Sequence, residues 1–315
     1  MKEVSMTPTE IKRKRGDGKE VDEAVVALRS HFGRMGEILA VGDADEPILA
    51  PSVRAALFEW LSEIRSREAL EAAGLKPRNT ALFYGPPGCG KTTMAHHLAA
   101  RLGLPMLLVG PENIVSSGWG DADSALAKLF DKLKTSPIPC VAFIDEAEGI
   151  GGSRDKNTGG SADNARTSLM GVLLRKLETY DGFLVAATNR AEDIDQALWR
   201  RFHLQVSIDL PGADERFAIL RRYGLPFEFT DDDIDLLTDL TVGASPALLR
   251  GLMEGVKRTL IMGPKIGLDI SDAPSLFRRV VGAVAPPPEI ERPPLWVSQS
   301  KTASMSWPPT NKGKQ

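Results

Sequence analysis

The hydrophobic positions of this chain fall into short continuous runs, separated by longer stretches with helical spacing. The runs are TALFY (80–84), PMLLV (105–109), CVAFI (140–144), FLVAA (183–187) and LQVSI (204–208). Strands that are buried on both faces give near-continuous apolar runs, and helices between them form the crossovers of a parallel sheet. The pattern therefore predicts an α/β fold in which five parallel strands are covered by helices on both faces.

Helical spacing dominates on both sides of this alternating region. Residues 21–40 place Val25, Leu28 and Phe32 on one side of a helix, and a longer amphipathic helix is predicted from Pro51 to Gly74. After Pro211 and Gly212 the chain shows only helical patterns, at 212–223, 231–241, 246–262 and 272–284. These patterns predict a small helical domain.

Residues 286–315 differ in composition from the rest of the chain. They are rich in Pro, Ser and Lys and lack the apolar density of a core, although they contain Trp296 and Trp307. The two tryptophans could anchor a partner or dock on the protein's own surface, and we favour the second interpretation. The predicted organisation is an N-terminal extension (1–47), an α/β domain (48–210), a helical domain (211–285) and a Pro-rich tail (286–315).

Composition limits the expected location. The chain is 42% hydrophobic and 26% charged, the balance of a soluble globular protein. No apolar run approaches the roughly 20 residues that span a bilayer. The two cysteines, Cys89 and Cys140, show no disulfide framework, which suits a reducing compartment. We therefore expect a cytoplasmic protein that does not enter a membrane.

Charge gives only weak support for a nucleic-acid partner. The formal net charge is -3, which provides no general attraction to phosphate backbones. A basic cluster runs from Lys12 to Arg15, and we interpret it as a solvated terminus in preference to a nucleic-acid contact. Nucleic acid stays an alternative partner but not the favoured one.

A glycine-rich loop follows the first predicted strand. Its residues Gly85, Pro86, Pro87, Gly88, Cys89, Gly90, Lys91 and Thr92 match the pattern G-x-x-x-x-G-K-[ST], and Thr93 continues into a helix. Glycines let backbone N–H groups turn toward phosphate oxygens, and the N-terminus of the helix adds a favourable dipole. We expect Lys91 to bind the β- and γ-phosphates of ATP and the Thr92 hydroxyl to bind Mg²⁺. Cys89 fills a free position of the pattern and is interpreted as a bystander.

Acidic and amide side chains end the third and fourth predicted strands. Asp145 and Glu146 follow CVAFI, and Asn189 follows FLVAA by way of Thr188. Ligands of open α/β sheets bind outside the carboxyl ends of the strands. Asp145 is expected to help hold Mg²⁺, and Glu146 to deprotonate the attacking water. Asn189 is expected to position that water.

Two adjacent arginines, Arg200 and Arg201, precede the fifth predicted strand. They could form a solvated pair at the surface. They could instead stabilise transition-state charge on a nucleotide that a neighbouring molecule binds. The spacing alone leaves both interpretations open.

The segments GPPGCGKTT, FIDEAEGI, ATNR and IDQALWRRF occur in this order between residues 85 and 202. Together they resemble the AAA family within the AAA+ ATPases, and the resemblance extends from about residue 48 to about residue 285. The compact WRRF is similar to the katanin and spastin branch and to short bacterial AAA proteins. The resemblance implies a sheet of order 5-1-4-3-2, a helical lid, and a homo-oligomeric ring, usually a hexamer, with ATP at each interface. It also implies that Asn189 is sensor 1 and that Arg200 and Arg201 act in trans.

The family carries a pore loop between the second and third strands, in which an aromatic, an aliphatic and a glycine residue grip a polypeptide. The aligned residues here are Gly118, Trp119 and Gly120, so the aromatic residue is displaced by one position. Trp119 either contacts a client or packs in the core, and we weigh the two interpretations equally. The glycine-rich stretch 151–166 fits a second mobile loop that faces the pore. Arg250 is left out of the catalytic set, because Pro246 and Ala247 replace the family's usual Gly-Ala before it.

These features favour a ring-forming ATPase that remodels a protein client. One alternative is a DNA-associated ATPase, such as a loader or a transposition helper, on the strength of the basic terminus. Another is an ATP-dependent switch that regulates a partner enzyme through its Trp-bearing tail. A phosphotransferase is not favoured, because the sequence contains nothing that resembles an acceptor site.

Overall fold

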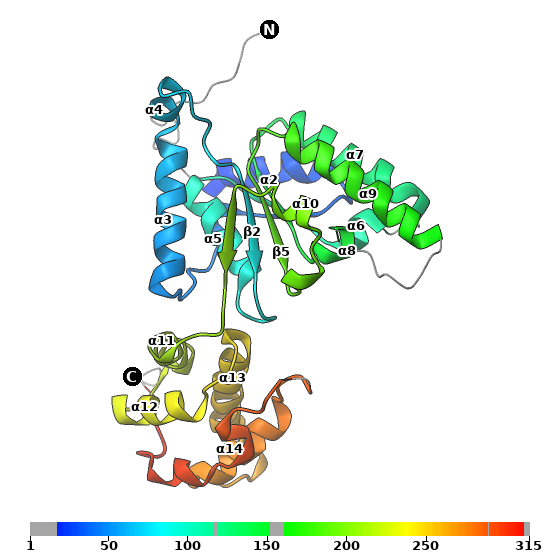
Figure 1. Ribbon diagram of the computed structural model, residues 1–315. Coiled ribbons are helices and arrows are strands. Elements are labelled where there is room, and N and C mark those ends of the chain that lie inside the picture. The colour runs from blue at the N-terminus through cyan, green and yellow to red at the C-terminus, as the bar shows by residue number, and fades with distance from the viewer. Residues whose placement is uncertain (1–17, 116–118, 152–160, 289, 312–315) are drawn as a thin grey trace. The chain divides into compact units, whose positions relative to one another are not determined.

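The computed structural model describes residues 18–115, 119–151, 161–288 and 290–311 (Figure 1). The chain divides into two compact units. The α/β unit contains the residues up to Pro47 together with Ser52–Gly85 and Lys91–Ile208. The helical unit contains Ile48–Pro51, Pro86–Gly90 and the residues from Asp209 onward.

A six-stranded sheet forms the centre of the α/β unit. Its strands are β1 (Glu37–Leu39), β2 (Thr80–Tyr84), β3 (Met106–Val109), β4 (Val141–Ile144), β5 (Leu184–Thr188) and β6 (Leu204–Ser207), in the spatial order β1-β3-β4-β5-β2-β6. The strands from β2 to β6 pair in parallel, and reading from β6 to β3 gives the order 5-1-4-3-2 that the resemblance implied. Every residue of β4 and β5 is buried, which explains their continuous apolar runs.

The strand at the edge of the sheet, β1, was not predicted. Helix α2 (Gly18–Phe32) ends where Gly33 takes a φ of +61°, so the predicted helix over 21–40 is wrong beyond Phe32. The chain then turns back, and β1 pairs antiparallel with β3. The sheet therefore has six strands instead of the expected five.

Helices cover both faces of the sheet, with α3 and α5 on one side and α7 and α9 on the other (Figure 1). The helices of this unit besides α2 are α3 (Pro51–Arg65), α4 (Arg67–Ala72), α5 (Lys91–Leu102), α6 (Pro111–Val115), α7 (Trp119–Lys134), α8 (Glu148–Gly151), α9 (Ser161–Glu178) and α10 (Gln196–Trp199). The predicted helix from Pro51 to Gly74 is divided at Ser66, where φ is -98° and ψ is 22°. Leu28 and Phe32 of α2 join the core that α7 and α9 form with the sheet.

Four longer helices build the helical unit, close to their predicted bounds. They are α11 (Ala213–Gly224), α12 (Asp231–Leu240), α13 (Pro246–Met262) and α14 (Ala273–Ala283). Ser245 caps α13 by accepting the N–H of Leu248, and Pro246 occupies the first turn. The apolar faces of the helices meet in one core that includes Leu237, Leu252 and Phe277.

The segment after α14 is part of this core. Helix α15 (Pro294–Val297) buries Leu295 and Trp296, and β8 (Thr310–Asn311) pairs with β7 (Phe227–Glu228). The indole N–H of Trp307 donates to the carbonyl of Ile270 at 2.7 Å. Docking of both tryptophans on the protein's own surface is therefore confirmed. Composition predicted that this segment cannot form a core of its own, and its buried described residues join the core of the helices instead.

None of the helices in the described ranges is both long enough and apolar enough to cross a membrane.

Candidate functional site

The glycine-rich loop joins the end of β2 to the start of α5. Gly85, Gly88 and Gly90 all have positive φ, at +142°, +75° and +87°. At Gly85 a Cβ atom would lie 2.2 Å from the carbonyl oxygen of Ile208, so this position admits no side chain. Pro86, Pro87 and Cys89 lie within the loop, and Thr93 is exposed in the first turn of α5.

Lys91 is the first residue of α5, and its side chain folds back over the loop. It is only 6% exposed, and its ammonium donates to the carbonyl of Gly85 at 2.8 Å. The charged group is thus held at Gly85, the first residue of the glycine-rich pattern.

Thr92 and Asp145 are brought together from different elements. The Thr92 hydroxyl donates to Oδ2 of Asp145 at 3.2 Å, and Asp145 follows β4 directly. A hydroxyl and one carboxylate suit Mg²⁺, which takes further ligands from water and phosphate oxygens. The described residues contain no group of three or more His, Cys, Asp or Glu side chains that could hold a metal ion.

Glu146 has an uncommon backbone conformation for a residue with a side chain, with a φ of +48°. Its N–H donates to Oδ1 of Asp145 at 3.0 Å, and the next residue, Ala147, donates to the carbonyl of Ala187 at 2.8 Å. These bonds tie the turn after β4 to strand β5. Asp145 and Glu146 line an open hollow of about 440 Å³, together with Glu37 and Glu112. Strained residues of this kind concentrate at functional sites.

Asn189 follows β5 at the same edge of the sheet. Its backbone N–H donates to Oε1 of Glu148 at 3.4 Å. The other carboxylate oxygen of Glu148 is buried and has no hydrogen-bond partner among the described residues. Sequence reasoning missed Glu148, although the signal was visible as a third acid in FIDEAEGI.

Arg200 and Arg201 lie apart from these residues. The carbonyl of Arg201 accepts from the Thr80 hydroxyl at 3.2 Å, and Thr80 is the first residue of β2. The Arg201 guanidinium forms an ion pair with Glu178 at the end of α9. Arg200 is exposed and has no ion pair in the part of the chain that the structure describes. The structure therefore gathers Lys91, Thr92, Asp145, Glu146 and Asn189 at the carboxyl edge of the sheet and anchors the backbone of Arg201 near its amino edge.

The pore-loop prediction is only partly covered by the described residues. Gly118 lies outside them, whereas Trp119 and Gly120 begin helix α7, with side chains outside the description. The choice between pore and core for Trp119 therefore stays a prediction. For the second expected loop, 151–166, the structure begins helix α9 already at Ser161, and residues 152–160 lie outside the described ranges.

Two contacts of Arg250 lie within the helical unit. Its Nε donates to Oε1 of Glu254 at 2.7 Å, and its guanidinium lies 5.4 Å from the ring centre of Tyr223. Both partners belong to the same unit, on α13 and α11.

Comparison with known proteins gives the family. Residues 81–210 match the model of the ATPase family associated with various cellular activities (AAA). The chain is 34% identical over 203 residues to FTSH 2, a chloroplastic ATP-dependent zinc metalloprotease of Oryza sativa, and 33% identical over 199 residues to the proteasome-activating nucleotidase of Thermococcus gammatolerans. It is 35% identical over 189 residues to y4kL, an AAA family ATPase of Sinorhizobium fredii.

The matched regions cover 62%, 60% and 59% of this chain, respectively. They cover only 30%, 49% and 56% of the three relatives, so the chain spans less than two thirds of their length. The matched family model extends from β2 to the residues just after β6, which includes the phosphate loop, both acids, Asn189 and both arginines. Residues 81–210 therefore form a domain that matches the AAA family of P-loop ATPases.

Proposed function

We propose that this chain is a magnesium-dependent ATPase whose subunits complete one another's active sites in a ring and remodel a protein client. The observation that carries the proposal is the separation of two sets of residues within the α/β unit. The groups suited to ATP lie at the carboxyl edge of the sheet, and the arginine segment is anchored at the amino edge.

The carboxyl-edge residues supply the chemistry of hydrolysis. Lys91 and the loop N–H groups would bind the phosphates, and Thr92 and Asp145 would hold Mg²⁺, which would supply positive charge to the phosphate oxygens. Glu146 accepts a proton from the attacking water. Asn189, on the neighbouring strand, orients that water.

The arginines suit a nucleotide bound by another subunit. Arg201 is bonded to the first residue of β2, whereas Lys91 follows the loop after the last residue of that strand. The four residue steps from the first to the last residue of β2 span about 13 Å. This length separates the carbonyl of Arg201, which is bonded at the start of β2, from the phosphate loop of the same subunit, which begins after its end. A contact that joins different faces of two identical subunits is heterologous, and repeating it closes a ring or extends a helix. Six subunits are expected from the family resemblance.

The class of client is inferred from the relatives. One is named a proteasome-activating nucleotidase and another an ATP-dependent metalloprotease, and both names describe work on proteins. By analogy we propose a polypeptide client, gripped near Trp119, and a cytoplasmic location. Similarity to a family suggests a function, and experiments on the site itself must test it.

The two alternative functions have less support. The basic cluster of the DNA-binding alternative lies outside the described residues, so no contact in the structure favours it. The partner-switch alternative needs a tail that is free to bind, whereas Leu295 and Trp296 are buried in the helical unit.

The first experiment is to measure the mass in solution of the Glu146→Gln variant, with and without ATP and magnesium. Loss of the proton acceptor should stop hydrolysis and trap any assembly that depends on bound ATP. We expect a discrete oligomer with ATP and magnesium, and its absence in the matched Lys91→Ala control, which should not retain the nucleotide. A Glu146→Gln protein that binds ATP but stays monomeric at high concentration would refute action in trans.

A further inference from the structure

We propose that Thr80 is a positioning residue for the arginine step. Its hydroxyl fixes the backbone on which Arg200 is presented to the nucleotide of a neighbouring subunit. This inference rests on the proposed function, because it assumes that Arg200 acts in trans.

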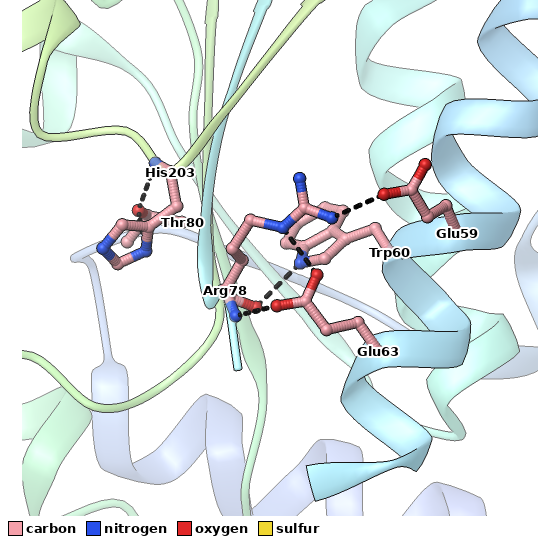
Figure 2. A network of polar contacts seen from close by, with 6 residues as sticks. All are labelled: Glu59, Trp60, Glu63, Arg78, Thr80 and His203. Carbon is pink, nitrogen blue, oxygen red and sulfur yellow. Dashed lines mark hydrogen bonds and ion pairs between the residues drawn. The ribbon is translucent and has the colours of Figure 1, made fainter. Parts of the chain in front are cut away.

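The contacts of Thr80 converge on the segment that follows Arg200. Thr80 is 1% exposed, and its hydroxyl donates to the carbonyl of Arg201 at 3.2 Å and accepts the N–H of His203 at 3.1 Å. Nδ1 of His203 also lies 3.1 Å from the same oxygen (Figure 2). When Nδ1 carries the proton, this oxygen accepts twice and donates once, so its hydrogen-bonding capacity is fully used. One buried hydroxyl thus holds the backbone on both sides of Phe202.

The place where Thr80 holds this segment lies in the interior of the sheet. Strand β2 is paired with β5 on one side and β6 on the other, and Thr80 through Phe83 are buried. At the other end of β2 the ring centre of Trp199 lies 5.1 Å from that of Tyr84. The residues on both sides of Arg200 therefore contact the same buried strand.

The attachments leave Arg200 as the side chain that is free to reach outward. Arg201 is held by its carbonyl at Thr80 and by its guanidinium at Glu178. The N–H of Arg200 donates to the carbonyl of Gln196 at 3.2 Å, so its backbone continues the short helix α10. Its side chain is exposed. A small backbone shift would move such a guanidinium out of line with a phosphate, and misplacement of about 1 Å can cost about 10²-fold in rate.

The same end of β2 offers a matched control. Arg78 is clamped by Glu59 and Glu63 of α3, and its carbonyl accepts the indole N–H of Trp60 at 2.8 Å (Figure 2). None of these bonds involves the arginine segment. Glu63→Gln should therefore loosen the entry to β2 without moving Arg200.

The test measures ATP hydrolysis and ATP affinity for Thr80→Val, which keeps the size of the side chain and removes the hydroxyl. We expect kcat to fall about tenfold with an unchanged Kd for ATP. Thr80→Ser should restore kcat, and Glu63→Gln should keep the wild-type kcat. Thr80→Ala serves as a second variant if Thr80→Val does not fold.

A double-mutant cycle with Arg200→Ala distinguishes an effect of Thr80 on the position of Arg200 from a general loss of folded structure. If Thr80 acts through Arg200, adding Thr80→Val to Arg200→Ala should lower kcat no further. If the two losses multiply, or if Thr80→Val alone leaves kcat unchanged, the positioning role is refuted while the proposed function stands. If the Arg200→Ala variant itself hydrolyses ATP at the normal rate, the proposal that Arg200 acts in trans is refuted instead.

Discussion

The carboxyl and amino edges of the central sheet hold their functional residues in different ways. At the carboxyl edge some bonds lie within one motif, such as Lys91 to Gly85 and Glu146 to Asp145, and others join motifs that are themselves recognisable in the sequence, such as Thr92 to Asp145. At the amino edge Arg201 is held by Thr80, 121 positions earlier in the chain, and by Glu178. A site built from neighbours in sequence can be read as a motif. A site built from distant residues becomes visible only in the fold.

The largest loss of kcat is expected from substitutions of the two arginines, and it should distinguish their roles. Arg200→Ala should lower kcat about 10³-fold, because it removes a cation that stabilises transition-state charge. Arg201→Ala should cost less, because its guanidinium is already paired with Glu178. Steady-state ATPase assays on both variants measure this, with the surface variant Arg221→Ala as a control for loss of an exposed arginine. Equal losses at both positions would contradict the assignment of separate roles.

At the carboxyl edge, Glu146→Gln should lower kcat by at least about 10²-fold and leave ATP affinity unchanged, because only the proton acceptor is removed. Glu112→Gln is the matched control, since Glu112 lines the same hollow but lies within helix α6. It should keep a rate close to wild type. Binding and single-turnover measurements separate the two effects, and weaker ATP binding in Glu146→Gln would point to a different role for this acid.

A smaller effect is expected at Glu148, which links the acid-bearing turn to Asn189. Glu148→Ala removes the acceptor of the Asn189 N–H and should lower kcat about tenfold through displacement of that residue. Glu148→Gln keeps an acceptor oxygen and should retain most of the rate. The measurement is kcat at saturating ATP. A loss that appears only in KM would argue against an effect on Asn189.

The smallest effect should be confined to stability at the amino edge. Burial opposes the charge on Arg78, but the hydrogen bonds and charges of Glu63 and Glu59 outweigh it, so the pKa of Arg78 is raised above its ordinary value. Glu63→Gln weakens this clamp and should lower the free energy of unfolding by about 1 kcal/mol. Denaturant unfolding followed by Trp fluorescence measures the change. A large fall in kcat would show that the ion pairs of Arg78 also affect the active site.

Much of the fold could be predicted, because its signals are local. Strands β2 to β5 are buried and form near-continuous apolar runs, and the four helices after Asp209 carry regular amphipathic spacing. Strand β1 could not be predicted in this way, because three residues carry little periodicity and are held by main-chain pairing with β3. Docking of Trp296 on the protein's own surface was favoured from the sequence, but the Pro-rich composition around it could not identify the helices that receive it.

The residues of the site also fall into those with local sequence signals and those that only the fold reveals. Lys91, Thr92, Asp145 and Glu146 were predicted from short motifs, and the structure brings them to one edge of the sheet. Thr80 and Glu148 were missed. A threonine at the start of a strand and a third acid in a helical turn are ordinary residues in sequence. Their importance comes from the partners that the fold supplies, the carbonyl of Arg201 and the N–H of Asn189.

The pairing of β8 with β7, and the burial of Trp296, have a consequence for synthesis on the ribosome. The helices that receive these residues are complete by Ala283, but their core closes only when Leu295, Trp296 and the segment up to Asn311 have emerged. At about 5–20 residues per second, a nascent helical unit stays open for seconds after its last long helix is made. During that interval its apolar face is a natural binding site for chaperones, whereas the α/β unit can already have closed around its own sheet.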